Sequence, residues 1–550
     1  MRSEPVRHSI HGEQGIALVI ALFMMLAMSV LGASLMFVSK TETLSSHNYR
    51  LMSQARYGAE SGIHQAANYL LSTAYLNIAP GSATDPGTYD DVNNIANFNN
   101  YNVNVSPVTR KSDNSVVKLS WDSTQSSYPI DAVKTAFAQA THGNLDVSDA
   151  PVVFKATATL KSMRPIKDNF TGQMVVLQTW EVVGEGSVTG ARDATVEVSA
   201  LVERQPNPIF AYAAFSTDPG CSSMSFGGGG STDSFDSRTM TLGADGRPVT
   251  SASGGDVGTN GNLVVSGSGN NNNATVINGT LSTPRTGVGT CTTSNVTAET
   301  INGQATVTGG LVQLSQSVAY PTPPVPNPAP TPGTNVKFQG SCPAAASSVC
   351  SQVTYAAGTI PGVSGAVTYT TLDPALATST GGKIVLSDVE TQSGNVLVLK
   401  GGGCATCTAE YNFNSLTMNS NSTILIAPGT GQVKINILGK QTNGNTMTTP
   451  ITITGNGLVN TNLQYDPMDL QIIYAGTGGV QLAGGEKTSA LIYAPNASGR
   501  FTGGSDLYGA VVLKNLTDLG GAAIHYDRAM KNEALTAGDY MMSAFTWKNY

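Results

Sequence analysis

Residues 14–40 read QGIALVIALFMMLAMSVLGASLMFVSK, and this stretch decides how the chain is organised. From Ile16 to Val38 it contains no charged residue, and the run begins directly after Gly15. As a helix, the run would be about 35 Å long, enough to cross the roughly 30 Å hydrocarbon core of a bilayer. The sequence therefore predicts one membrane-spanning helix near the N-terminus.

The polar leader before this run favours an N-terminus in the cytoplasm, because Arg2 and Arg7 lie in it. A cleaved secretory signal is the alternative, but the apolar core of such a signal has only about 7–15 residues. Such a signal also ends in a cleavage site made of small residues, and the only small-residue stretch near the end of this run is Gly32-Ala33-Ser34. We expect a single-pass protein whose larger part lies outside the cytoplasm.

The helix is predicted to continue past Lys40. Apolar residues recur there at steps of three, four and seven, which places one stripe along a helix; they are Leu44, Leu51, Ala55, Ala59, Ile63, Ala66 and Leu70. We expect one helix over Ile16–Leu71 that is fully apolar at first and amphipathic afterwards. Gly58 and Gly62 weaken this expectation in the second half, because glycine disfavours helix.

Two stretches of this helix resemble a known family. Gln14–Leu22 (QGIALVIAL) and Ala55–Ile63 (ARYGAESGI) are similar to the N-terminal region of PilX-type minor pilins, and also to the large pseudopilin of type II secretion. The resemblance implies that a prepilin peptidase cuts between Gly15 and Ile16, and it implies methylation. It also implies an inner-membrane protein before assembly, then a pilus or cell-surface protein whose helix contacts other pilins.

Ile20 departs from the pattern of the major subunits. Major pilins have Glu at the fifth mature position, where it engages the N-terminal amine of a neighbouring subunit, and that position here is Ile20. The departure resembles minor subunits assigned to filament tips. A plain N-terminal anchor that never enters a filament is the alternative.

Composition supports an exported, β-rich protein. Among 550 residues only 12% are charged, glycine occurs 60 times, and the net charge is -7. A basic tract that could track phosphates is missing from the sequence, so we expect no nucleic-acid partner. The chain is longer than one typical domain.

The part after the helix is predicted to divide in two. Residues 72–206 resemble a pilin-like α+β head, with a helix near 130–139 and a turn at Thr84–Gly87. Three β-branched stretches predict an antiparallel sheet; they are Val152–Leu160, Met174–Gly184 and Ala194–Val202.

Residues 207–550 are predicted to form a large all-β domain. Short apolar runs bounded by Gly, Asn, Ser or Thr recur along it, and near the C-terminus they start about twenty residues apart; these last ones are Leu470–Tyr474, Ala490–Tyr493 and Ala510–Leu513, followed by Ala523–Tyr526. The spacing favours a parallel β-helix, with a β-sandwich as the alternative. The Pro-rich segment 320–333 is predicted to carry the chain across the surface of this domain.

Three stretches of this domain resemble, more loosely, the β-rich domain of large PilX-type proteins. They are Phe226–Ser237, Gly503–Ala510 and Ile524–Asp527. That domain has no established activity, so the resemblance implies none for this chain.

All six cysteines lie between residues 221 and 407, which favours disulfides in an oxidising compartment. Cys342 and Cys350 can close a short loop, and Cys404 with Cys407 has redox-motif spacing but lies in a β-rich stretch that favours a structural staple. Cys221 and Cys291 remain as a pair that the sequence does not establish.

The sequence does not predict an enzyme, a metal site or a cofactor. Asp233 and Asp236 form a tight acidic pair in a turn, His525 lies in a predicted strand, and Tyr465–Asp469 reads as a turn. We expect a minor pilin-like subunit, tip-located, that acts in assembly or adhesion through a surface or glycan ligand. The alternative is a membrane-anchored surface enzyme or glycan-binding protein.

Overall fold

A computed structural model describes residues 14–72, 75, 101–145, 151–167, 174–189, 193–267, 274–360, 363–404, 407–454, 458–460, 465–484, 488–532 and 535–549. The chain divides into two compact units. The head comprises residues 1–167, 174–206 and 537–550, and the β-domain comprises residues 168–173 and 207–536. The predicted turn at Thr84–Gly87 lies outside the described residues.

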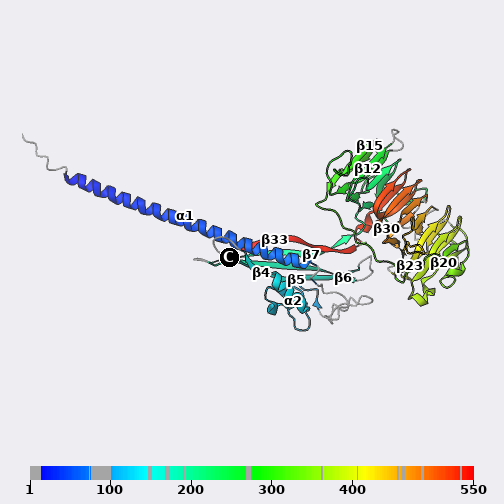
Figure 1. Cartoon of the computed structure of the whole chain (residues 1–550), viewed down its shortest axis with the longest axis horizontal. Helices are drawn as coiled ribbons and strands as arrows, with labels where there is room; N and C mark the ends of the chain where they lie inside the picture. The colour runs from blue at the N-terminus through cyan, green and yellow to red at the C-terminus, as the bar shows by residue number, and fades with distance from the viewer. Residues whose placement is uncertain are drawn as a thin grey trace, which may run out of the picture. The chain divides into compact units, whose positions relative to one another are not determined.

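The predicted N-terminal helix is present as α1, Gln14–Leu71 (Figure 1). Its second half packs along two long strands of the head, β5 and β6. Besides α1, the head contains one helix and several strands, which are β1 Tyr101–Asn102, β2 Thr109–Arg110, β3 Lys118–Ser120, α2 Asp131–Ala140, β4 His142–Leu145, β5 Val152–Lys167, β6 Met174–Val188, β7 Ala194–Pro208 and β33 Leu535–Asn549. A 3-10 turn at Ser123–Gln125 precedes α2.

The last strand of the chain returns to the head. The main head sheet has the order β3-β5-β6-β7-β33, with β4 paired to β5. The described pairs from β3 to β7 are antiparallel, as the sequence predicted for the head. The sequence assigned 207–550 to one continuous domain, whereas the structure places residues 537–550 in the head. In sequence, the β-domain is thus an insertion between β7 and β33.

The β-domain consists of short strands that stack in parallel rows. One row joins ten strands, each paired in parallel with the next: β18 Asn335–Phe338, β21 Ile384–Thr391, β23 Thr408–Met418, β26 Ile451–Ile453, β29 Val480–Ala483, β30 Thr488–Thr502, β31 Asp506–Asp518, β9 Met224–Gly227, β12 Leu263–Gly267 and β15 Glu299–Gly303. A β-sandwich needs antiparallel sheets, and these pairs are parallel.

Two further rows share this direction. The first continues from β21 and β23 through β25 Gln432–Ile437, β28 Leu470–Tyr474, β30 and β31 to β8 Ala214–Ser216, β11 Val257–Thr259, β14 Leu281–Thr283 and β17 Leu311–Gln313. The second contains β31, β32 Ala523–Asp527, β10 Ser231–Phe235, β13 Thr275–Ile277 and β16 Ala305–Val307. A separate five-stranded sheet contains β19 Cys350–Tyr355, β20 Val367–Leu372, β22 Val396–Leu399, β24 Thr423–Ile426 and β27 Leu458–Asn460.

The chain enters this stack in its middle. The first strands, β8, β9 and β10, pair on one side with β11, β12 and β13 and on the other side with the late strands β31 and β32. The chain therefore builds outward to β17, crosses to the far end at β18, and builds back towards its start. This order brings the two ends of the inserted segment together, which insertion into another domain requires.

The Pro-rich segment makes the crossing. The Tyr493 hydroxyl in β30 donates to the Pro321 carbonyl at 2.6 Å, and the Asn412 amide in β23 donates to the Pro328 carbonyl at 2.9 Å. The Gly333 amide donates to the Asp388 carboxylate in β21 at 3.0 Å. Proline lacks the N–H that a central strand needs, so the segment runs across the rows and is held by side chains.

Candidate functional site

More than half of the exposed large apolar side chains among the described residues lie in the first half of α1. Its large side chains from Ile16 to Val38 are all more than half exposed, from 52% at Val19 to 76% at Met36. By length and composition, the Ile16–Leu70 part of α1 can span a membrane. A contiguous exposed apolar surface of this kind marks a contact with lipid or with other proteins.

The residues of the predicted cleavage site lie at the start of this helix. Gly15 and Ile16 belong to the first turn of α1, and Ile20 is 52% exposed. The structure leaves the processing of this site as a prediction. It places Ile20 on the same uncovered half of the helix as the other apolar residues.

The second half of α1 is buried against the head sheet. Ala55, Ala59 and Ile63 have no exposed surface. The helix lies very close to β6, because a Cβ atom at Gly186 would be 1.9 Å from the Ala55 carbonyl oxygen and one at Gly184 would be 2.2 Å from the Ala59 carbonyl oxygen. The two strand glycines, which the sequence analysis did not single out, therefore position the helix.

Helix glycines complete this contact. A Cβ atom at Gly58 would be 2.6 Å from a methyl group of Val152. The helix predicted through Gly58 and Gly62 is present, since α1 runs unbroken through both. Close packing against β5 and β6 outweighs their helix propensity, which costs only about 1 kcal/mol each.

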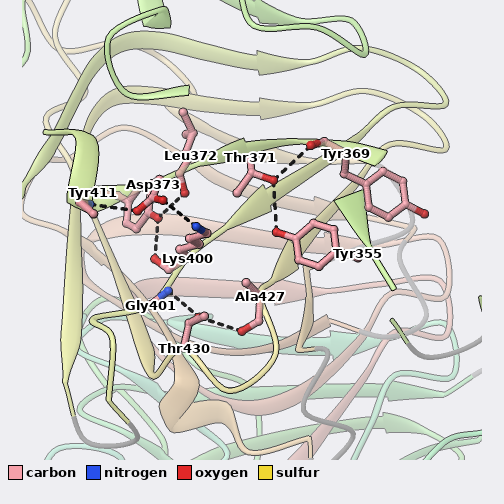
Figure 2. Close-up of polar contacts among 11 residues, drawn as sticks. Tyr355, Tyr369, Thr371, Leu372, Asp373, Lys400, Gly401, Tyr411, Ala427 and Thr430 are labelled. Atoms are coloured by element: carbon pink, nitrogen blue, oxygen red, sulfur yellow. Dashed lines mark hydrogen bonds and ion pairs between the residues drawn. The ribbon is translucent and has the colours of Figure 1, made fainter. Parts of the chain in front are cut away.

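A polar cluster lies at the carboxyl ends of β20 and β22 (Figure 2). The Lys400 ammonium is 2.6 Å from the Asp373 carboxylate, and the buried Tyr411 hydroxyl donates to the Lys400 carbonyl at 2.7 Å. Burial raises the pKa of Tyr411 well above its ordinary value. The Lys400–Asp373 ion pair and the neutral Tyr411 hydroxyl connect adjacent turns of the chain. These described groups do not form a nucleophile with an adjacent general base.

The predicted residues Asp233 and His525 meet across β10 and β32. His525 Nδ1 lies 2.5 Å from Asp233 Oδ1, and the Tyr508 ring stacks on the imidazole at 4.4 Å between centroids. The side chains of His525 and Asp233 are only 11% and 16% exposed. Asp236 instead accepts a hydrogen bond from the Arg238 amide, as a turn residue does.

The predicted turn at Tyr465–Asp469 is a 3-10 turn, Pro467–Asp469, capped by the Asp466 side chain. Burial raises the pKa of Asp466 to about 6. Three or more His, Cys, Asp or Glu residues arranged to hold a metal ion do not occur in the part of the chain that the structure describes.

The carboxyl group of Asp518 is buried, and neither of its oxygens accepts a hydrogen bond from another described residue. It has no exposed surface, and burial first, then the charge of Asp506, raises its pKa well above the ordinary value. Because the folded-state pKa is raised, ionisation lowers stability as pH rises from about 4 towards that pKa.

We expect Asp518→Asn to remove this pH dependence. The urea midpoint of the β-domain should match that of the wild type near pH 4 and exceed it at neutral pH, because asparagine stays uncharged. Urea unfolding followed by far-ultraviolet circular dichroism at several pH values measures this. Asp113→Asn is the control, because hydrogen bonds from Ser115 lower the pKa of this exposed head carboxylate and its replacement should not raise the midpoint at neutral pH. An Asp518→Asn midpoint that falls with pH as in the wild type would contradict the assignment.

The structure pairs the six cysteines as Cys221–Cys291, Cys342–Cys350 and Cys404–Cys407. No described cysteine is free. The Cys404–Cys407 pair follows a run of glycines and does not lie at the N-terminus of a described helix. A helix N-terminus, which lowers the thiol pKa in many redox-active cysteine pairs, is therefore not what surrounds this pair.

Two protein families match parts of the chain. Residues 14–64 match the PilX N-terminal family, and residues 401–533 match a family described as a domain of unknown function (DUF7305). No match was found among curated proteins. The crystal structure of the competence-associated pilin ComZ from Thermus thermophilus aligns at 13% identity and a TM-score of 0.24, over 90% of this chain and 97% of that chain.

The PilX N-terminal match, residues 14–64, lies within α1 (Gln14–Leu71) and includes both its exposed first half and most of the half that packs on the head sheet. The DUF7305 match covers the late strands of the β-domain, from the Cys404–Cys407 turn to beyond β32. Residues 14–64, most of the N-terminal helix α1, are therefore similar to the N-terminal region of the PilX family.

Proposed function

We propose that this protein is a minor pilin-like subunit of a type IV pilus or related filament. Residues 16–71 would pack among the helices of other pilins, after residence in the inner membrane. The inserted β-domain would project at or near the filament tip and act in assembly or surface adhesion. On this proposal a prepilin peptidase releases Ile16 as the mature N-terminus.

The contrast between the two halves of α1 carries this proposal. The same helix is buried against its own head from Leu51 to Leu70 and uncovered from Ile16 to Val38. A plain anchor would need only the uncovered half. A continuous helix joins the apolar half rigidly to the head, so helices packed in a filament would hold the head at its surface.

The size of the exported part supports a low copy number. The chain beyond Leu71 includes both the head and an inserted β-domain of more than 300 residues. Such a bulk is difficult to repeat at every step of a tightly wound filament. One copy at the end, or few copies, avoids that clash, and Ile20 in place of Glu agrees with an unusual subunit.

We assign the stacked parallel rows of the β-domain to a parallel β-helix, and we propose a binding rather than a catalytic role for it. Each row advances by one strand per turn of chain, as in a coiled solenoid. The His525–Asp233 pair lies under Tyr508 and is nearly closed to solvent. A general base must reach its substrate, and this geometry disfavours that access.

Sequencing of the mature N-terminus tests the proposal. We expect Ile16 as the first residue in cells with the prepilin peptidase, and an uncut chain in cells that lack it. Gly15→Leu should block cleavage, whereas Gly12→Leu, three residues away in the same leader, should leave it intact. An uncut Met1 in peptidase-positive cells, or cleavage after Ala33, would contradict the proposal.

Antibody labelling tests the position. We expect gold-labelled antibody against the β-domain at filament ends, and loss of filaments in a deletion strain if the subunit is needed for assembly. Filaments that persist without surface attachment would indicate adhesion instead. Label along the whole shaft would refute a tip location.

A further inference from the structure

Segments of the chain itself lie over two of the three rows of the β-domain. In the row through β28, β30, β31 and β8, the outer side chains of Tyr493, Val512 and Phe215 are in register and almost completely buried. The Pro-rich segment covers them, since the Tyr320 and Phe215 ring centroids are 4.7 Å apart and the Tyr493 hydroxyl bonds to that segment. The outer surface of this row is therefore already occupied.

The row through β31, β32 and β10 is covered in a similar way. The outer side chain of Tyr508 in this row is buried, and the Tyr465 ring packs on it at 4.9 Å between centroids. Arg247, from the loop that follows β10, reaches the Asp506 carboxylate at 3.0 Å. The covering segments thus belong to this chain in both rows.

The ten-strand row differs, because its outer side chains are polar and accessible to solvent. Their neighbours within the strands, such as Val480 and Leu482, are buried in the core. The accessible column is bounded by Glu390 at one end and by Val264 at the other. Between these two residues it consists of six side chains that are paired strand to strand and are each partly or fully exposed: Thr417, Thr452, Gln481, Arg500, Thr517 and Ser225. We call this column the open face.

Two cations lie in the middle of the open face. Arg500 is one of its members, and Lys514 precedes Asn515, which pairs with Ser498 on the same two strands. Both cations are exposed, and within the described chain neither charged group has an ion-pair or hydrogen-bond partner. Lys400, in contrast, is paired with a carboxylate at 2.6 Å. The net charge of the chain is -7, so this pair of cations does not reflect a general excess of positive charge.

We infer that the open face binds an acidic polysaccharide, a sugar chain with carboxylate groups, laid along the strand stack. This inference rests on the binding role proposed above for the β-domain. Hydroxyl and amide side chains both donate to and accept from sugar hydroxyl groups, and a guanidinium binds a carboxylate through two parallel hydrogen bonds. Successive strands are about 4.8 Å apart, which is close to the length of one sugar unit in an extended chain.

Other polymers fit the open face less well. Nucleic-acid binding draws its affinity from the neutralisation of several phosphates, and two cations supply little of that. Protein interfaces have an apolar core in which aromatic residues are enriched, whereas the six side chains of the open face include none that is aromatic or aliphatic. The same composition argues against insertion into a lipid surface.

Binding of the full chain, kept in detergent micelles, to immobilised polygalacturonate tests this inference. We expect saturable binding by the wild type and at least about tenfold weaker binding by Arg500→Ala/Lys514→Ala, because both carboxylate contacts are lost. Arg528→Ala/Lys531→Ala removes the same two charges from exposed positions outside the open face and is the matched control. It should bind like the wild type, and thermal midpoints verify that both variants are folded.

Two competitors sharpen the test. Free polygalacturonate should displace the protein, whereas neutral dextran and duplex DNA should not. The inference is overturned if the wild type does not bind polygalacturonate, if Arg500→Ala/Lys514→Ala binds as tightly as the wild type, or if DNA competes better than polygalacturonate. Ile16 at the mature N-terminus without polygalacturonate binding would overturn this inference alone and leave the filament-subunit proposal standing. An uncut chain that binds polygalacturonate would do the reverse.

Discussion

Replacing Gly186 with alanine is expected to unfold the head. The new Cβ atom would lie 1.9 Å from the Ala55 carbonyl oxygen and 2.4 Å from the Ala59 backbone nitrogen, and neither atom can move without shifting α1. Real side-chain atoms do not approach so closely. We expect a loss of about 3 kcal/mol or more, the upper end of what overpacking a core costs, because the obstructing atoms belong to the backbone.

Tryptophan fluorescence reports this loss selectively. Trp121, Trp180 and Trp547, the three tryptophans of the chain, all belong to the head. Gly365→Ala is the matched control, because a Cβ atom there meets nothing within 4 Å. We expect a large fall in the thermal midpoint for Gly186→Ala and none for Gly365→Ala. If both variants melt like the wild type, the close approach of α1 to β6 is wrong.

Removing the Cys221–Cys291 disulfide is expected to destabilise the β-domain most among the three bridges. Its two cysteines are 70 residues apart, against 8 for Cys342–Cys350 and 3 for Cys404–Cys407. By loop-closure entropy, the long bridge contributes about 4 kcal/mol and the shortest about 1.5 kcal/mol. The long loop also spans the first turns of the stack, from β9 to β14.

Two double variants measure this difference. Cys221→Ser/Cys291→Ser should shift the urea midpoint far more than Cys404→Ser/Cys407→Ser, which serves as the control. Far-ultraviolet circular dichroism follows the β-domain, and free-thiol assays verify that the remaining bridges stay closed. Equal shifts for the two variants, or a larger one for the short loop, would contradict a dominant role of loop closure.

Local patterns predicted most of the secondary structure. The apolar run and its amphipathic continuation predicted one helix, and α1 spans Gln14–Leu71 against the expected Ile16–Leu71. The three head strands begin where the β-branched stretches begin, at Val152, Met174 and Ala194. These signals are local, because burial on one face imposes a period on the residues themselves.

The candidate residues of the β-domain were predicted less completely. Asp233 and His525 were each singled out as turn and strand residues, but only the fold brings them to 2.5 Å, since they are 292 positions apart. Asp518 carried no local signal, because an aspartate before a glycine pair reads as a turn. Its burial depends on the strands stacked on both sides of it.

The sequence by itself determined the helix, the antiparallel head sheet and the β-rich character of the long C-terminal region. Only the tertiary structure decided that β33 closes the head, that the stack starts in its middle, and that glycines at positions 184 and 186 seat the helix. Periodicity records which face of an element is buried, whereas pairing between distant strands and the distance between packed backbones depend on residues that are far apart in the chain.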